Sequence, residues 1–168
     1  KPLRLTLTRA HIVPQTVTYR RENDVAFLKI SSFNRHTIAE VRKAVADARR
    51  EIGPSMKGLI LDLRGNPGGL LDQAVGVADL FLTSGLIVAT RGRHPASNSA
   101  FAATGDDISH GLPIAVLING KSASASEMLA AALQDWGRAV VVGSASHGKG
   151  SVQNVIRMPN GGELILTW

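Results

Sequence analysis

The first third of the chain changes from an alternating pattern of hydrophobic and polar residues to a helical one. Three segments alternate or are rich in β-branched and aromatic residues, and this predicts strands over 2–12, 16–19 and 25–33. From residue 37 to 53 the apolar positions recur with helical spacing, which predicts a helix. Thr37 and Glu40 have the spacing of a capping box at its start, and Gly53-Pro54 provides a stop.

From residue 58 onward, short apolar runs alternate with loops and helical patterns. The runs predict further strands, of which the first is expected to be covered on both faces: 58–63, 86–90, 113–118 and 139–143. Helices are expected over 70–82 and from the serine-rich stretch up to Gly137. Residues 91–111 show no periodicity and predict a long, mobile loop. A hairpin is expected around residues 159–162.

Repeated strand–loop–helix units predict an α/β fold with a largely parallel central sheet. In such folds the loops at the carboxyl ends of the strands gather at one place and form the site. Here those loops are the segments richest in glycine and serine: RGNPGG (64–69), NGKSASAS (119–126) and GSASHGKG (143–150). We therefore expect the functional residues to lie in these three loops.

Composition excludes several classes of function. With 168 residues, 44% hydrophobic and 19% charged, the chain is expected to form one soluble globular domain. Aromatic residues make up only 4%, which argues against a nucleic-acid-binding surface, and the basic residues behind the net charge of +6 are scattered. There is no cysteine, the five histidines lack metal-ligand spacing, and no apolar run approaches the roughly 18 residues of a membrane span. We expect no metal and no cofactor.

Ser124 allows two interpretations. Ser124 and Glu127 fit a capping box, which stabilises a helix start by about 1 kcal/mol and needs no function. A serine at a helix start also lies among free backbone N–H groups, where it could attack a carbonyl carbon. The N–H of Ala125 would then face the developing oxyanion, and Gly68 and Gly69 at the start of the preceding helix could supply a second donor.

Lys149 also has two interpretations. Gly143 to Lys149 nearly match the phosphate-binding pattern G-x-x-x-x-G-K-[ST], but Gly150 lacks the required hydroxyl and a β-branched segment follows instead of a helix. A nucleotide site is therefore not expected. On a strand, Lys149 and Gln153 would point to the same side, where a neutral lysine could serve as the base for a serine and the carboxamide could hold its amine.

Three blocks of the sequence resemble, in order and spacing, the signature motifs of the C-terminal processing peptidases, also called tail-specific proteases: LILDLRGNPGG (59–69), NGKSASASEMLAAALQD (119–135) and VVVGSASHGKGSVQ (140–153). The resemblance covers essentially the whole chain. It implies that Ser124 is the nucleophile, that Lys149 is the general base and that Gln153 positions the lysine. It also implies an oxyanion hole formed by the backbone N–H groups of Gly68, Gly69 and Ala125. Asp135 matches a family acid that we interpret as structural.

The resemblance further implies a crotonase/ClpP-like β/α superhelical core, usually preceded by a PDZ domain. The chain begins with Lys1 and ends within an apolar run, as expected for part of a longer protein. Residues 1–13 are expected to be the remnant of a PDZ domain end and its linker, and residues 14–168 a serine peptidase core truncated at its C-terminus. Expected substrates are unfolded or tail-exposed proteins with apolar C-termini, in the periplasm or another exported location. The alternative is a non-catalytic peptide or apolar-ligand binding module. The sequence leaves open whether the chain forms a homo-oligomer.

Overall fold

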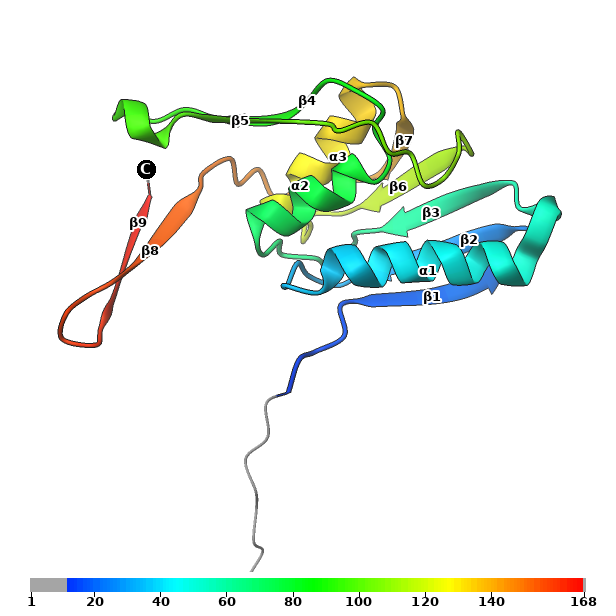
Figure 1. The fold of residues 1–168 in the computed structure, drawn as a ribbon, viewed down its shortest axis with the longest axis horizontal. Helices are drawn as coiled ribbons and strands as arrows, with labels where there is room; N and C mark the ends of the chain where they lie inside the picture. Colours follow the sequence, from blue (N-terminus) through cyan, green and yellow to red (C-terminus); the bar gives the residue numbers. More distant parts are fainter. Residues whose placement is uncertain (1–11, 168) are drawn as a thin grey trace, which may run out of the picture.

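A five-stranded sheet forms the centre of the protein in the computed structural model, which describes residues 12–167 (Figure 1). Its strand order is β1-β2-β3-β6-β7, with β1 antiparallel to β2 and the remaining neighbours parallel. The strands are β1 (Val17–Glu22), β2 (Val25–Ile30), β3 (Gly58–Asp62), β6 (Ile114–Ile118) and β7 (Ala139–Gly143). This confirms the predicted α/β fold with a largely parallel sheet. The strand predicted over 2–12 lies almost entirely outside the described residues.

Three helices connect the parallel strands and lie on one side of the sheet (Figure 1). They are α1 (Thr37–Ile52), α2 (Leu71–Asp79) and α3 (Ala125–Asp135). Among the described residues, no helix combines the length and the apolar character needed to cross a membrane. The second helix ends before the predicted residue 82, because the carbonyl of Leu80 accepts a hydrogen bond from the Ile108 N–H (2.9 Å) instead of continuing the helix.

The hydrophobic core lies between the sheet and the helices. Leu28, Leu61 and Val116 point to this side from neighbouring strands and are fully buried, and so is Phe81, two residues after the end of α2. Burying each such side chain contributes about 1.5–3 kcal/mol. The opposite face of the sheet is more open, since Val140 is 68% exposed on the edge strand. The strand β3 itself is buried at every residue except the half-buried Ile60, and its buried residues lie on both faces, as expected for the 58–63 strand, although the helices lie on one side of the sheet.

The capping box predicted for Thr37 and Glu40 is also wrong. His36 is the N-cap residue of α1, so Thr37 already lies inside the helix. The Glu40 carboxylate instead accepts hydrogen bonds from the N–H groups of Thr16 (2.8 Å) and Val17 (2.9 Å) at the start of β1. A carboxylate that satisfies unpaired N–H groups of a distant segment competes successfully with a local cap.

Residues 91–111 are not the long mobile loop that the sequence predicts. The short strand β5 (Ser99–Ala102) pairs antiparallel with β4 (Leu86–Thr90), and a 3₁₀ turn over Pro95–Ser97 lies between them. A four-residue strand of three small residues and one phenylalanine carries too little periodicity to be detected, so the pairing with β4 defines it. Figure 1 shows this two-stranded ribbon above α2 and beside the upper part of α3.

The predicted C-terminal hairpin is confirmed. Strands β8 (Gln153–Arg157) and β9 (Glu163–Thr167) pair antiparallel around the turn at 159–162, and all their side chains are exposed. Figure 1 shows the hairpin projecting away from the central sheet.

Candidate active site

The loops that follow β3, β6 and β7 meet at the carboxyl edge of the sheet, as predicted. The N–H of Ala123 in the second loop donates to the carbonyl of Asn66 in the first (3.0 Å). The N–H of His147 in the third loop donates to the carbonyl of Ser122 in the second (3.0 Å). Backbone hydrogen bonds thus join all three loops into one structure.

The two outer serines of the S-A-S-A-S run hold these loops together. Ser122 Oγ donates to the carbonyl of Leu63 (2.8 Å) and accepts from the Asn119 N–H (3.0 Å). Ser126 Oγ donates to the carbonyl of Asn66 (3.0 Å). Both serine side chains are fully buried. Their hydroxyls are therefore occupied with the backbone, in line with the interpretation that only the middle serine is available for chemistry.

Ser124 lies at the start of α3 in a strained backbone conformation. It is the N-cap residue, with φ 54° and ψ −115°. A non-glycine residue in such a conformation costs of order 1–3 kcal/mol, and strain of this kind collects at functional sites. A strained turn between strand and helix is the geometry that exposes the nucleophilic serine of α/β-hydrolases. The sequence lacks the G-x-S-x-G signature of that turn, so only the small neighbours Ala123 and Ala125 could have indicated it.

The glycine loop lies directly against Ser124. Asn66 is fully buried and organises this loop, since its Nδ2 donates to the Ile30 carbonyl (3.0 Å) and its Oδ1 accepts from the Gly68 N–H (2.8 Å). The Gly68 N–H is thus engaged within its own loop. Among the described residues, the N–H groups of Gly69 and Ala125 donate to no acceptor. Ala125 lines the same cavity as Ser124, whereas Gly68 and Gly69 do not.

Lys149 reaches the same cavity from the loop after β7. It and Ser124 both line this cavity, but no hydrogen bond among the described residues joins Lys149 Nζ to Ser124 Oγ. The predicted side-by-side row of Lys149 and Gln153 does not form along one strand, because β8 begins only at Gln153. Gln153 is not among the residues that line the cavity. The structure therefore brings Ser124 and Lys149 together and leaves Gln153 outside.

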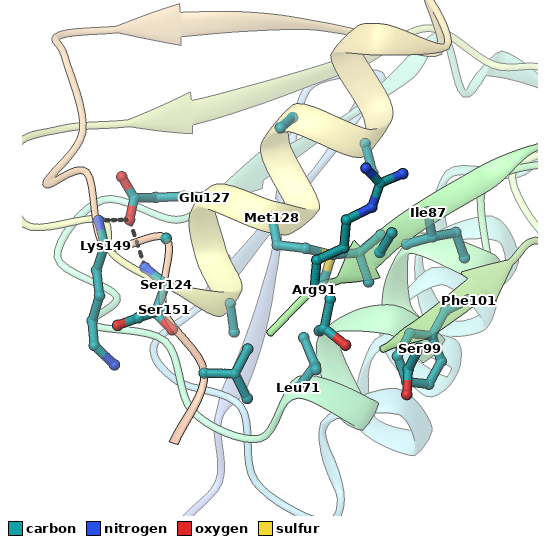
Figure 2. Close-up of a pocket in the computed structure, with 18 of the residues that line it drawn as sticks. Leu71, Ile87, Arg91, Ser99, Phe101, Ser124, Glu127, Met128, Lys149 and Ser151 are labelled. Carbon is teal, nitrogen blue, oxygen red and sulfur yellow. Dashed lines mark hydrogen bonds between the residues drawn. The ribbon is translucent and has the colours of Figure 1, made fainter. Parts of the chain in front are cut away.

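Glu127 connects the two candidate catalytic segments, which the sequence did not indicate. Its carboxylate accepts hydrogen bonds from the N–H groups of Ser124 (2.6 Å), Gly148 (2.5 Å) and Lys149 (2.9 Å) and from Ser146 Oγ (2.6 Å). Burial raises the pKa of Glu127, but these hydrogen bonds outweigh it and lower the pKa to about 2. Figure 2 shows the backbone nitrogens of Ser124 and Lys149 directed at this carboxylate, with the Lys149 side chain extending away from it. The capping box predicted for Ser124 and Glu127 is confirmed, but the pattern gives no sign of the three contacts to residues 146–149.

Asp62 anchors the glycine loop and takes no part in the cavity. It is buried and accepts from the backbone N–H (3.0 Å) and Nε (2.8 Å) of Arg64. Burial raises the pKa of Asp62, but the hydrogen bonds from Arg64 and the charges of Lys29 and Arg64 lower it overall. This confirms the interpretation of Asp62 as a loop anchor.

The cavity in front of Ser124 has a volume of about 770 Å³ and a largely apolar wall (Figure 2). The wall is formed by Leu71, Ile87, Val88, Phe101, Met128 and Ala132. Four charged residues also line it: Arg91, Glu127, Asp135 and Lys149. Among the described residues, no group of three or more acidic or histidine side chains is arranged to hold a metal ion. The cavity can take apolar side chains of a peptide beside a serine and a lysine.

This fold and site define an α/β protein with a serine-centred site of the hydrolase type. The chain belongs to peptidase family S41, whose family model matches residues 24–168.

Named relatives agree with this assignment. Over 168 residues, the chain is 46% identical to a carboxy-terminal-processing protease of Bartonella bacilliformis, which covers 99% of this chain and 39% of the relative. It is 34% identical to a probable CtpA-like serine protease of Staphylococcus saprophyticus, over 97% of this chain and 33% of the relative. The chain therefore spans less than half the length of these curated relatives.

Solved structures share the fold. The photosystem II D1 C-terminal processing protease matches with a TM-score of 0.80 and 28% identity, over 95% of this chain and 44% of that protein. A putative S41 protease from Bacteroides fragilis matches with a TM-score of 0.72 and 19% identity, over 92% of this chain and 45% of that protein. The second likeness concerns the fold alone.

Proposed function

We propose that the protein is a serine endopeptidase in which Ser124 is the nucleophile and Lys149 the general base. The observation that carries this proposal is the position of Ser124, in a strained turn at a helix start, on the same cavity as Lys149. Membership of peptidase family S41 supports it. The hydroxyls of the outer serines donate to backbone carbonyls. Ser124 Oγ accepts from the Glu127 N–H in the capping box and donates to no such carbonyl among the described residues, so its proton is available to a base.

In the proposed reaction, Lys149 takes the proton of the Ser124 hydroxyl as the oxygen attacks the scissile carbonyl carbon. Lys149 then returns that proton to the leaving amine, and an acyl-enzyme forms on Ser124. Water, activated by the same lysine, hydrolyses the acyl-enzyme and releases the second product. The step needs only the peptide, water and these two side chains.

The oxyanion would be held by backbone N–H groups next to Ser124. The Ala125 N–H is the first donor, since it follows the nucleophile at the positive end of α3. The second donor comes from the Gly68-Gly69 pair. Because the Gly68 N–H already donates to Asn66 Oδ1, we propose that the Gly69 N–H supplies it.

The substrates would be unfolded or tail-exposed proteins cut near apolar C-termini. An apolar cavity of this size beside Ser124 suits a large apolar side chain at the cleavage position. The names of the relatives, carboxy-terminal-processing and C-terminal processing protease, support a preference for chain ends.

A non-catalytic module that binds peptides or apolar ligands is the second candidate. One observation favours it, namely that Lys149 Nζ and Ser124 Oγ share a cavity without a hydrogen bond between them. Such a module would bind an apolar peptide tightly and release it uncut.

The test is turnover of an unfolded reporter protein with an apolar C-terminal tail, measured in the full-length protein. We expect Ser124→Ala to abolish cleavage and Ser122→Ala or Ser126→Ala to retain it, each assayed well below its unfolding temperature. Cleavage that survives in Ser124→Ala would overturn the assignment. Tight binding without cleavage in the unmodified protein would favour the binding module.

We further propose that residues 1–13 are the end of a PDZ domain and its linker, and that residues 14–168 belong to a core that continues in the parent protein. The limited share of each relative that the chain covers supports this division. An exported location, such as the periplasm, follows only from the resemblance to the family and stays a prediction. The oligomeric state stays open.

A further inference from the structure

We propose that Glu127 is a positioning residue that fixes the backbone of Lys149 relative to Ser124. This inference rests on the proposed function, because it takes Ser124 and Lys149 as the catalytic pair. Glu127 lines the cavity, but in this role it acts through the two segments that its carboxylate joins and not on the substrate.

The two carboxylate oxygens of Glu127 accept hydrogen bonds from different groups. Oε2 accepts from the N–H of Ser124 (2.6 Å) and the N–H of Lys149 (2.9 Å), so one atom joins the two candidate catalytic residues. Oε1 accepts from Ser146 Oγ (2.6 Å) and the Gly148 N–H (2.5 Å), which fixes the loop before the lysine. Hydrogen bonds to a charged acceptor contribute more than neutral ones, about 1.5–3 kcal/mol each.

A helix cap alone does not explain this arrangement. A capping box consists of two bonds, one from the Glu127 N–H to Ser124 Oγ and one from the Ser124 N–H to the Glu127 carboxylate, and this box is present. The other three donors belong to residues 146–149, about twenty positions further along the chain and in a different loop. Most of the hydrogen bonds to the Glu127 carboxylate therefore come from the loop of residues 146–149.

The backbone of Lys149 depends on its hydrogen bond to Glu127 because few other contacts fix this segment. In the part of the chain that the structure describes, no hydrogen bond joins residues 150–167 to the rest of the protein, and the β8–β9 hairpin that they form is fully exposed. On the N-terminal side of Lys149, the nearest backbone–backbone hydrogen bond to the rest of the protein runs from the His147 N–H to the Ser122 carbonyl. Glu127 is thus the last anchor before a hairpin that lies away from the body (Figure 1).

The chain offers a matched control for Glu127. Both residues lie in the first turn of a helix: Glu40 is the fourth residue of α1 and Glu127 the third of α3. The carboxylate of Glu40 also accepts hydrogen bonds from a distant segment. Its donors, Thr16 and Val17, lie at the start of β1, and Glu40 does not line the cavity. Glu40→Gln removes the same charge and a comparable hydrogen-bond set at a place where no catalytic residue is affected.

Glu127→Gln is the informative variant. A carboxamide keeps the shape of the side chain but replaces one acceptor oxygen by an NH₂ donor, which would face at least one N–H donor in either position. With the NH₂ at the Oε2 position both N–H bonds there are lost, and at the Oε1 position the Gly148 N–H loses its acceptor while the Ser146 hydroxyl can turn to accept. Either orientation therefore breaks at least one hydrogen bond to the loop of residues 146–149. Glu127→Asp keeps the charge with a shorter side chain and should recover part of the lost activity.

Two readouts in the full-length protein test the proposal. The first is steady-state cleavage of a peptide with an apolar C-terminus. We expect Glu127→Gln to lower kcat about 100-fold with KM nearly unchanged, since misplacement of a catalytic group by about 1 Å costs this much. The second is amide hydrogen exchange in residues 144–150, which should accelerate in Glu127→Gln and stay unchanged in Glu40→Gln. Both variants should unfold at similar temperatures.

The outcomes separate this inference from the proposed function. If Ser124→Ala is inactive while Glu127→Gln keeps the kcat of the unmodified protein, the positioning role is overturned and the function stands. If Ser124→Ala remains active, the proposed function fails, and hydrogen exchange in residues 144–150 still decides whether Glu127 ties the loop. Unchanged exchange in Glu127→Gln would overturn the inference in either case.

Discussion

A Cβ atom at Gly68 would lie 3.0 Å from the Cβ atom of Ser124 and 2.9 Å from the carbonyl oxygen of Ala123. The glycine loop therefore lies against the backbone of the serine turn with no room for a side chain. Gly68 also has a φ of +102°, which an L-residue with a side chain rarely adopts. The close approach of these two loops fixes where Ser124 stands.

Gly68→Ala should consequently lower kcat by at least tenfold and destabilise the protein, because the methyl group displaces Ser124 from the N–H groups beside it. Gly65→Ala is the control, since Gly65 lies in the same loop at φ +77° with no atom within 4 Å of its added Cβ. Gly65→Ala should introduce the strain of a side chain at positive φ without crowding Ser124. Thermal unfolding of each variant shows how much stability it has lost. If kcat falls equally in both variants, crowding of Ser124 does not affect catalysis and the prediction is wrong.

Ser122→Ala and Ser126→Ala should affect stability rather than chemistry. Ser122 loses two buried hydrogen bonds and Ser126 one, so the loss in the free energy of unfolding should be larger for Ser122→Ala. About 1 kcal/mol per hydrogen bond is expected. Urea unfolding monitored by circular dichroism measures the difference. The reverse order of the two losses would contradict the hydrogen-bond assignment.

Acid should weaken the protein partly through Glu127. Its pKa is about 2 in the folded protein and near 4.5 when unperturbed, so its contribution to stability is present above about pH 4.5 and disappears as the pH falls toward 2. The difference in unfolding free energy between the unmodified protein and Glu127→Gln should therefore shrink across this range. Asp62 and Asp107, whose pKa values are also lowered in the folded protein, are present in both proteins and cancel. A difference that stays constant down to about pH 2 would contradict the assignment.

The apolar wall of the cavity should set the preference for substrate tails. Ala131 lines the cavity and is exposed, so Ala131→Phe narrows it without disturbing the core. We expect KM to rise for peptides with a large apolar residue at the cleavage position and to change little for those with alanine. Gln134→Phe adds the same ring to an exposed position of α3 that does not line the cavity, and should leave both values unchanged. A similar response to the two substitutions would argue against this wall as the specificity pocket.

Much of the fold could be predicted from local pattern. The buried runs that became β3, β6 and β7, the helical spacing of α1 and the glycine- and serine-rich loops all indicated a parallel sheet with a site at one edge. Contacts between distant segments were beyond such patterns. The pairing of β5 with β4 and the use of Glu40 by the start of β1 depend on tertiary structure, which overrides local capping and loop signals.

The candidate site was predictable to a similar degree. Ser124 and Lys149 were identified from their motifs, and the structure places both on one cavity. The strained backbone of Ser124 could not be predicted from a local pattern. The three donors that residues 146–149 direct at Glu127 could not be predicted either, because they depend on how that loop folds back over the start of α3.

The most direct test of the central claim is the mass of the intact full-length protein after reaction with a fluorophosphonate, which phosphonylates activated serine hydroxyls. We predict a single adduct, located on Ser124 by peptide mapping, and none in Ser124→Ala. Lys149→Met should slow its formation by about 100-fold or more, as expected for loss of a general base. An adduct that persists in Ser124→Ala, or an unchanged rate in Lys149→Met, would contradict the Ser124–Lys149 assignment.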